Sequence, residues 1–457
     1  MRIEEEVLSS LRGWGDNPVA IEVGPGITNR AVNAPELLDG ITESAHFFQA
    51  QGLGPGTIAA MLFNNSIEFV QVFLALCTIG AIPVLLKPEY RKLELEEIFS
   101  NSRPSAIVAA KRFINSLRPV IRNQTVITSE GGTLALEGGS GQTCCATDLP
   151  AETASLIYTY RGYGYPLAAM VPHSQFYFGA KAFQELTQGL PGQRLLVVLP
   201  MSHIFTLVGC VLVPLLNKLT TVISNTLNPI RIFKYIEQFE IDRIIAVPEL
   251  YFLFLRFLDS STQIGSLKVL VSGGSLLRAS EFEVVRSKFH AELLHGYGLT
   301  EFAPVSGHIL GKARAGTVGP ACRPVDLRID EGEIQIRSPH LFSGYYRREK
   351  ETKEAFKDGW FRTGDIGKFD GDHLVFLREQ KKTCKVNGSL VDLEEVRRAI
   401  LRDTEIPDAL VQYDNDAVIA HIAVSSRLGL KEKIRSLVPF LQPLIADNKI
   451  PRKFGIL

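Results

Sequence analysis

Apolar residues in the first two thirds of the chain form short continuous runs separated by helical patterns. Residues 57–63 and 82–86 are such runs, as expected of strands buried on both faces. Between them, Ser66 is placed to cap a helix whose apolar positions recur every three or four residues until Gly80. Similar runs follow at residues 106–109, 155–158, 243–247, 268–271 and 291–294. The alternation predicts two similar layers, each a mostly parallel sheet covered by helices.

Two segments depart from this alternation. Residues 130–149 carry five glycines and predict an exposed loop. Residues 195–216 are mostly apolar and about as long as a bilayer crossing, but Pro200, His203 and Pro214 interrupt them. A buried strand, a loop and then a buried helix explain this segment better than an integral membrane span.

The pattern changes again near residue 332. Residues 333–337 alternate as a half-buried strand, and a turn at 370–373 lies between strands, which indicates a small β-barrel-like subdomain. The charged run at 378–382 then marks a domain boundary. Beyond it we expect a helix from about residue 391, a strand at 417–424 and a last helix over 430–445.

These patterns predict an α/β fold in two domains. Residues 1–378 form a large N-terminal domain of two helix-covered, mostly parallel sheets with the β-barrel-like subdomain. Residues 379–457 form a small α+β C-terminal domain. A chain of 457 residues with 46% hydrophobic residues is long and apolar enough for this arrangement.

Charge and cysteine content narrow the function classes. Lysine plus arginine and aspartate plus glutamate both number 49, so the net charge is +0 and no nucleic-acid partner is expected. The six cysteines are scattered without the paired spacing of a zinc site and predict reduced thiols in a cytoplasmic protein. The N-terminus is acidic, where a secretory signal would be basic and then apolar.

The candidate chemistry lies in two motifs. In residues 295–301 (HGYGLTE), glycines let the backbone approach a flat ligand, Tyr297 presents an aromatic face, and Glu301 is a carboxylate able to hold a hard cation. Taken alone, this motif is also compatible with a polar turn at the end of a strand. Residues 359–365 (GWFRTGD) form the second motif. Together they resemble the nucleotide site of the adenylate-forming superfamily, which includes acyl-CoA synthetases, peptide-synthetase adenylation domains and beetle luciferases.

The resemblance covers the chain from about residue 36 to its end and implies roles for particular residues. Glu301 would bind Mg²⁺, Thr300 would contact phosphate, Tyr297 would stack on adenine, and Asp365 would accept hydrogen bonds from the ribose. His203 would border the reacting carboxylate, which makes His203, Thr300 and Glu301 the implied catalytic residues; a structural buried histidine is the alternative for His203. The other implied nucleotide contacts are Thr159, Gly164, Gly273, Gly274, Gly296 and Arg378. The implied acyl pocket comprises His203, Phe205, Gly274 and Gly298.

The phosphate loop departs from the family pattern. In residues 159–168, Thr159, Gly164 and Pro166 match, but the small hydroxyl residues and the lysine of the family are replaced. Such a loop works through backbone N–H groups and little steric bulk. Its tyrosines must therefore either fill the pyrophosphate space or fold outward, and Arg161 is a candidate for the missing positive charge.

The domain junction and the end of the chain also differ. Lys382 matches the hinge, so the resemblance implies a mobile small domain. Lys385 and Gly388 match a lysine and a glycine of that domain, although a solvated charged linker is equally compatible with Lys382. The count from these residues leaves open whether Arg378 or the next residue takes the position of the ribose-binding arginine. Residues 450–454 match the run that precedes the family's catalytic lysine. That lysine is missing because the sequence stops, so we expect a truncated small domain.

The resemblance implies an ATP-dependent ligase. It would join a carboxylic acid, with a medium or long fatty acid favoured, to AMP and then pass the acyl group to coenzyme A or to the phosphopantetheine of an acyl carrier protein. ATP, Mg²⁺ and the thiol are the implied cofactors. Two alternatives remain: a non-catalytic relative that binds an adenylate, and a transferase that uses a preformed acyl-adenylate or thioester. Because the altered loop and the missing lysine weaken adenylate formation more than adenylate binding, we expect poor synthesis and retained binding of an adenylate.

Overall fold

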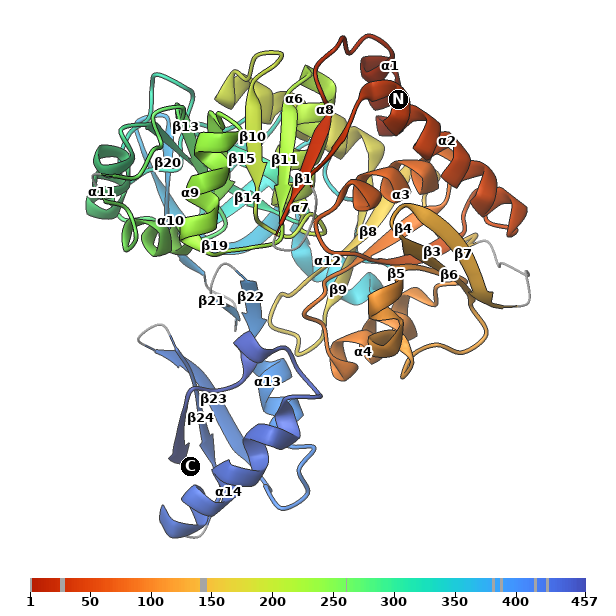
Figure 1. Cartoon of the computed structure of the whole chain (residues 1–457). Helices are drawn as coiled ribbons and strands as arrows, with labels where there is room; N and C mark the ends of the chain where they lie inside the picture. Colours follow the sequence, from red (N-terminus) through yellow and green to blue (C-terminus); the bar gives the residue numbers. More distant parts are fainter. Residues whose placement is uncertain are drawn as a thin grey trace.

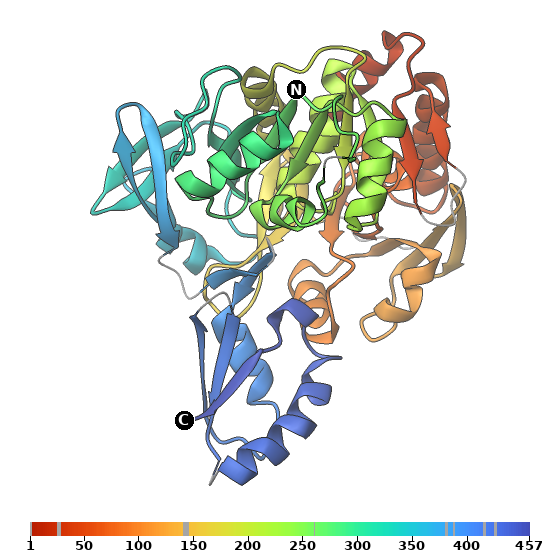
Figure 2. The same ribbon diagram turned by 60° about the vertical axis from the view of Figure 1, so that its left-hand side comes forward.

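The computed structural model describes residues 2–24, 29–139, 146–259, 261–379, 383–386, 389–414, 417–424 and 427–457. Figure 1 shows a large body built on two sheets, with the small C-terminal domain standing apart below it. The second view also places the small domain beneath the large body, with a short hairpin at the junction (Figure 2). The predicted fold class is confirmed.

The first sheet has seven strands in the order β7-β6-β5-β3-β4-β8-β9. Its inner strands run parallel, and β7 and β9 are antiparallel edges. The strands are β3 (Ile58–Leu62), β4 (Ile82–Leu86), β5 (Ala106–Ala110), β6 (Thr125–Glu130), β7 (Thr133–Gly138), β8 (Thr153–Thr159) and β9 (Leu167–Pro172). The helices of this region are α2 (Ala34–Ala50), α3 (Ile67–Thr78), α4 (Lys92–Ser102), η1 (Lys111–Phe113) and α5 (Ile114–Leu117).

The prediction of a loop over residues 130–149 is partly wrong, because β7 lies inside it. Gly131 and Gly132 have φ values of 62° and 89°, so they form a tight turn that folds β7 back along β6. The glycines were interpreted as a sign of an irregular loop, whereas they are the turn of a hairpin. Residues 140–145 lie outside the described residues.

The second sheet has eight strands in the order β15-β14-β13-β12-β10-β11-β1-β2. They are β1 (Ala20–Val23), β2 (Arg30–Val32), β10 (Arg194–Val197), β11 (Thr220–Ser224), β12 (Arg243–Ala246), β13 (Val269–Ser272), β14 (Glu292–Leu299) and β15 (Phe302–Gly307). The accompanying helices are α1 (Ile3–Arg12), α6 (His173–Thr187), α7 (Ile204–Thr206), the π-helical turn η2 (Leu207–Leu212), α8 (Val213–Asn217), α9 (Pro229–Gln238), α10 (Pro248–Leu255) and α11 (Ala279–Phe289). Strand β10, a loop and the α7–η2–α8 helix account for residues 195–216 as predicted.

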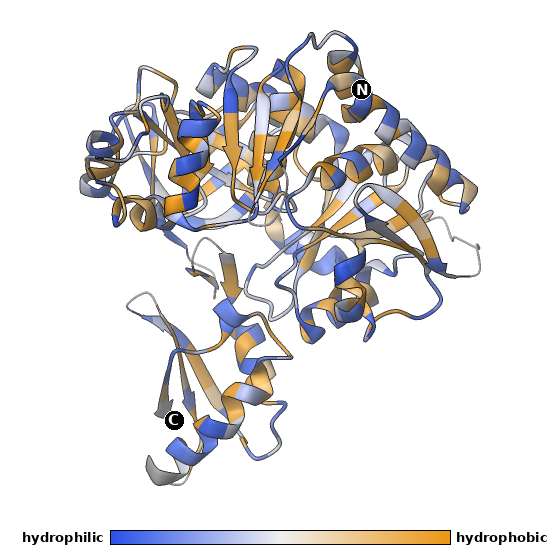
Figure 3. Ribbon diagram, in the orientation of Figure 1, coloured by the Kyte–Doolittle hydropathy of each residue, from blue (hydrophilic) through white to orange (hydrophobic). Residues whose placement is uncertain are grey.

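Buried apolar residues explain why these elements pack as layers. The strands are the most hydrophobic parts of the large body, and the helices turn polar residues outward (Figure 3). One core cluster extends from α1 and α3 through η2 to β15, so it joins the two sheets. Among the described residues, no helix is both long and apolar enough to cross a membrane.

The third sheet is antiparallel and forms the predicted barrel-like subdomain. Its elements are β16 (Asp326–Asp330), β17 (Glu333–Arg337), α12 (Glu349–Ala355), β18 (Phe356–Lys357), β19 (Trp360–Asp370) and β20 (His373–Glu379). The predicted turn at residues 370–373 connects β19 to β20.

The small domain begins with a hairpin that points at the large body (Figure 2). Its elements are β21 (Thr383–Val386), β22 (Ser389–Asp392), α13 (Leu393–Ile400), β23 (Ala409–Asp414), β24 (Ala417–Ile422), α14 (Arg427–Leu441), η3 (Asp447–Lys449) and β25 (Lys453–Ile456). An apolar core formed largely by β22, α13, β23, β24 and α14 stabilises it, and Leu93 of α4 in the large body also belongs to this core. Its mobility stays a prediction.

Candidate functional site

A cavity of about 740 Å³ opens between the large body and the small domain. It lies at the carboxyl ends of β13 and the parallel part of β14, the position at which ligands bind in open α/β sheets. Among the residues predicted for the site, its lining includes Thr159, His203, Phe205, Gly273, Gly274, Gly296, Tyr297, Gly298, Thr300, Glu301, Asp365, Arg378 and Lys385. Lys382 and Gly388 lie outside the described residues.

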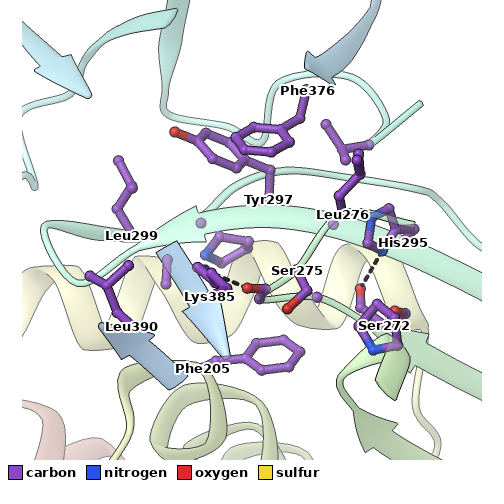
Figure 4. A pocket seen from close by; sticks show the side chains of 18 of the residues that line it. Phe205, Ser272, Ser275, Leu276, His295, Tyr297, Leu299, Phe376, Lys385 and Leu390 are labelled. Carbon is purple, nitrogen blue, oxygen red and sulfur yellow. Dashed lines mark hydrogen bonds between the residues drawn. The ribbon is translucent and has the colours of Figure 1, made fainter. Parts of the chain in front are cut away.

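The end of β13 sets the shape of the cavity. Gly273 and Gly274 follow this strand, and a Cβ added at Gly273 would lie 3.0 Å from the Phe205 ring. Gly274 has a φ of +82°, a conformation that favours glycine. Lys385 reaches in from β21 and donates a hydrogen bond to the carbonyl of Gly274 (Figure 4). The strand end, the helix that bears Phe205 and the small domain therefore meet at one point.

Tyr297 and Asp365, the residues predicted to bind adenine and ribose, contact each other. The Tyr297 hydroxyl donates to Asp365 Oδ2 at 2.6 Å. One face of the Tyr297 ring stacks on Phe376, with centroids 5.7 Å apart and an interplanar angle of 29° (Figure 4). The pair lines the same cavity as Gly273 and Gly274. Sequence reasoning missed Phe376, which lies outside both motifs.

We expect Asp365→Ala to weaken AMP binding. The carboxylate is buried and positioned beside the aromatic ring, and each charge-assisted hydrogen bond to a ribose hydroxyl is worth about 1.5–3 kcal/mol. Calorimetric titration with AMP measures the effect. Asp326→Ala is the control, because Asp326 lies in β16 outside the cavity lining and pairs with the exposed Arg337 of β17. Equal AMP affinities of the two variants would contradict the assignment of Asp365 to the ribose.

His203 is held as a neutral ring at the start of α7. Its Nδ1 accepts a hydrogen bond from the Phe205 amide at 3.3 Å. Burial, together with the nearby ammonium groups of Lys87 and Lys385, lowers the pKa of His203 to about 3. The imidazole therefore acts as an uncharged hydrogen-bonding group at neutral pH and contributes no positive charge to the cavity.

Glu301 does not fit the predicted Mg²⁺ role. The Tyr345 hydroxyl donates to its Oε1, and the Arg161 guanidinium lies 3.4 Å from the same oxygen. The side chains of Glu301 and Arg161 are only 3% and 10% exposed. Arg161 is held further by a 2.7 Å hydrogen bond to the carbonyl of Arg362 and by the ring of Phe361. A guanidinium already neutralises the carboxylate that a hard cation would need.

Among the described residues, no group of three or more His, Cys, Asp or Glu side chains is arranged to hold a metal ion. The predicted charge of Arg161 is present, but it is directed at Glu301 and not into the cavity, which Arg161 does not line.

Gly164, which the resemblance predicts to contact the nucleotide, contacts the small domain instead. Gly164 does not line the cavity. Its amide donates to Asp392 Oδ2 at 3.1 Å, and its carbonyl accepts from Arg398 at 2.6 Å, both in the small domain. A Cβ added there would lie 3.0 Å from Glu394 Cγ. The glycine is needed for close contact between the two domains.

Two of the three tyrosines in the loop fold outward, whereas Tyr160 lines the cavity. Tyr163 and Tyr165 fold away from the cavity and donate to Glu354 and Glu351 of α12. The phosphate-loop segment is therefore committed to protein contacts, with β8 and β9 running into and out of it.

Tyr160 belongs to a buried charged cluster that joins the domains. Lys449 of the small domain lies 2.6 Å from Glu395 and 2.8 Å from Glu94 of α4, and it donates to the Tyr160 hydroxyl at 2.9 Å. The side chains of Lys449, Glu395 and Glu94 are 4%, 7% and 0% exposed. Burial raises the pKa of Glu395 to about 7 against the opposing effect of Lys449. Sequence reasoning found no sign of this cluster, whose members are far apart along the chain.

Comparison with known proteins identifies the family. The profile described as "AMP-binding enzyme" matches residues 11–346, more than half of the chain. The chain is a member of the AMP-binding enzyme family. The resemblance to adenylate-forming enzymes predicted above is thereby confirmed.

Curated relatives of this AMP-binding enzyme are CoA ligases by name. A putative acyl–CoA ligase, YdaB, of Bacillus subtilis is 26% identical over 374 residues, covering 76% of this chain and 74% of the relative. A 4-coumarate–CoA ligase-like protein of Arabidopsis thaliana is 27% identical, covering 84% and 75%. A long-chain-fatty-acid–CoA ligase of Yersinia pestis is 26% identical, covering 87% and 80%.

Solved structures share the fold of this AMP-binding enzyme. The amide bond synthetase McbA of Marinactinospora thermotolerans superposes with a TM-score of 0.85 at 22% identity, covering 100% of this chain and 96% of that one. The o-succinylbenzoate CoA synthetase MenE of Bacillus subtilis, bound to a product analogue, superposes with a TM-score of 0.83 at 20% identity, covering 99% and 94%. The fold of the whole chain is therefore shared with these two enzymes.

Proposed function

We propose that this AMP-binding enzyme transfers an acyl group from an acyl-adenylate to a thiol and makes that adenylate poorly from Mg-ATP. In the transfer step the thiol sulfur attacks the acyl carbonyl carbon. The bond from that carbon to the phosphate oxygen breaks, AMP leaves with the electron pair, and the thiol proton passes to solvent. The acyl-CoA ligase names of the relatives support thioester formation as the product-forming step.

The loop at residues 159–168 is the observation that carries this proposal. A pyrophosphate cradle requires free backbone N–H groups and a cation. Here the Gly164 amide is bonded to Asp392, and the guanidinium of Arg161 is paired with Glu301. The residues that would grip the AMP part, Tyr297 and Asp365, remain along the cavity wall.

A fatty acyl chain fits the inner part of the cavity. Part of its lining is apolar and comes from α6, the η2 turn, β13, β15 and the segment after β15. The apolar members are Phe183, Leu186, Val208, Val271, Ala303 and Val318. Such a wall favours binding of an acyl chain by burial of apolar surface. Medium or long chains are the favoured substrates.

The acceptor enters from the side of the small domain. Lys385, Tyr413 and Arg452 line the cavity there and belong to the small domain. Coenzyme A, or the phosphopantetheine arm of an acyl carrier protein, would bring both its phosphates and its thiol to this face. The positive charges of Lys385 and Arg452 suit such an anionic acceptor.

A complete ligase, acting on an acid, Mg-ATP and a thiol, is the second candidate, and the names of the relatives favour it. ATP–pyrophosphate exchange across a panel of acids separates the two. We expect exchange near background for the native chain with octanoate, dodecanoate, hexadecanoate and 4-coumarate. Brisk exchange with any acid would reject the proposed function in favour of the complete ligase.

Arg161→Ser should create a dependence on Mg²⁺. Removing the guanidinium leaves Glu301 Oε1 with the neutral Tyr345 hydroxyl and leaves a buried carboxylate without a counter-charge, so a divalent cation gains a site. We expect Mg²⁺ to raise the affinity of the variant for ATP at least tenfold and to leave the ATP affinity of the native chain unchanged. Arg362→Ser is the matched control, because this exposed arginine pairs with Glu333 instead. The same Mg²⁺ response in the native chain would contradict the role of Arg161.

A further inference from the structure

Two lysines face the cavity with no carboxylate between them. Lys87 directly follows β4, and Lys385 lies in β21 of the small domain; both line the cavity next to His203. Within the described ranges, the Lys87 ammonium forms no ion pair or hydrogen bond, and its Nζ lies 5.7 Å from the centroid of the Tyr90 ring. Lys385 donates to the Gly274 carbonyl, a neutral acceptor. Neither ammonium forms an ion pair with another described residue.

The surroundings concentrate positive charge on this point. Burial lowers the pKa of Lys87; Glu89 opposes the change, and the ammonium groups of Lys449 and Lys385 add to it. The same pair, Lys87 and Lys385, helps to depress the pKa of His203. Lys87 is half-buried, and the carboxylates that act on it from a distance are those of Glu89 and Glu94. An ammonium that is partly removed from water and has no ion-pair partner is stabilised by a bound anion.

Other cations of the cavity are already engaged or lie at its edge. Arg278 pairs with Glu281 at 2.9 Å, and Arg378 donates to the carbonyl of Glu379. Arg161 is held by Glu301 behind the cavity wall. Of the described cavity cations that form no ion pair, which also include Arg378 and Arg452, Lys87 and Lys385 are therefore the two near His203.

We propose that Lys87, assisted by Lys385, is an anion-binding residue for the charged group at the junction of the acyl chain and the nucleotide. The ligand chemistry is an oxyanion, either the phosphate of the AMP part or the carboxylate of the free acid. This proposal rests on the proposed function, because it places both ligand parts in the same cavity. Lys385 comes from the small domain, so the site is complete only while that domain is docked.

Lys87→Met removes the charge and keeps much of the side-chain length. Calorimetric titrations compare two matched pairs of ligands. AMP differs from adenosine by its phosphate, and dodecanoate differs from dodecanol by its carboxylate, so each pair measures the contribution of one anionic group to binding. If the anion is the phosphate, the variant should bind AMP about ten- to a hundredfold more weakly and adenosine unchanged. If it is the carboxylate, dodecanoate should lose affinity and dodecanol should not. Either pattern supports the proposal.

Lys181→Met is the matched control, because Lys181 also lies over a tyrosine ring, at 4.6 Å from that of Tyr177, but outside the cavity lining. Lys87→Arg keeps the charge and should retain most of the affinity. The melting temperature of the unliganded Lys87→Met variant should be unchanged or higher, since an uncompensated ammonium is removed.

Affinities of Lys87→Met for AMP and dodecanoate that both equal those of Lys181→Met would overturn the proposal. Failure of the proposed function has a different signature. In that case the native chain would bind neither AMP nor adenosine, and the dodecanoate and dodecanol titrations alone would decide whether Lys87 holds an anion.

Discussion

Lys449→Met is expected to undock the small domain by leaving Glu94 and Glu395 buried without their shared counter-charge. Removing one partner of a buried ion pair costs about 3–5 kcal/mol, because the charge left behind stays out of water. Here one ammonium serves two carboxylates, 2.8 and 2.6 Å away, and also donates to Tyr160. Glu94 belongs to the large body and Glu395 to the small domain, so the loss falls on the contact between them.

Hydrogen exchange at the Gly164 amide measures this effect directly. That amide donates to Asp392 across the domain contact, so it exchanges when the domains separate. A cost of about 3–5 kcal/mol corresponds to roughly a hundred- to several-thousandfold faster exchange. Lys92→Met is the control, because Lys92 forms an exposed pair with Glu96, worth at most about 1 kcal/mol.

A second substitution tests the cause. In the double variant Lys449→Met, Glu395→Gln, only the Glu94 carboxylate stays buried without a counter-charge. The Gly164 amide should therefore exchange more slowly than in Lys449→Met alone. Protection in Lys449→Met that matches Lys92→Met would show that the cluster does not hold the domains together. The predicted mobility of the small domain would then be the better description.

Most of the large body could be predicted from the sequence because buried parallel strands leave a simple pattern. Residues 57–63 and 82–86 are continuous apolar runs, and the structure contains β3 and β4 there. The interrupted segment at residues 195–216 could also be interpreted, since Pro200 and His203 are poor residues for a membrane helix. The two motifs located Tyr297 and Asp365, which lie side by side in the cavity.

The remaining features depend on pairs of residues that lie far apart in the chain. No local pattern shows that Arg161 pairs with Glu301 or that Lys449 meets Glu94. Gly164 matched a family position, but its neighbours are side chains of another domain. Its role in the domain contact follows from packing, which spacing along one chain does not reveal.

A non-hydrolysable acyl-adenylate analogue is expected to stabilise the folded chain strongly. A ligand that binds only the folded state stabilises it by roughly 3–4 kcal/mol at 100 to 1,000 times its dissociation constant. The analogue would use the Tyr297–Asp365 pair for its nucleoside and the apolar wall for its chain. It carries no pyrophosphate and therefore makes no demand on the loop that holds Arg161 and Gly164.

Mg-ATP should stabilise the chain much less. Its pyrophosphate would need the backbone groups that bind Asp392, and its cation would compete with Arg161 for Glu301. AMP, which lacks the pyrophosphate, should lie between the two ligands. The ranking of acyl-adenylate analogue over AMP over Mg-ATP is the result expected from thermal unfolding at equal ligand concentrations. Stabilisation by Mg-ATP that equals or exceeds that of AMP would contradict it.

The most direct measurement of the central claim is thioester formation from two alternative starting materials. One reaction contains synthetic dodecanoyl-adenylate and coenzyme A, and the other contains dodecanoate, Mg-ATP and coenzyme A. The account predicts dodecanoyl-CoA from the preformed adenylate at a rate well above that of the uncatalysed reaction, with little or none from the acid and Mg-ATP. Comparable rates from both starting materials, or no catalysed transfer from the adenylate, would contradict it.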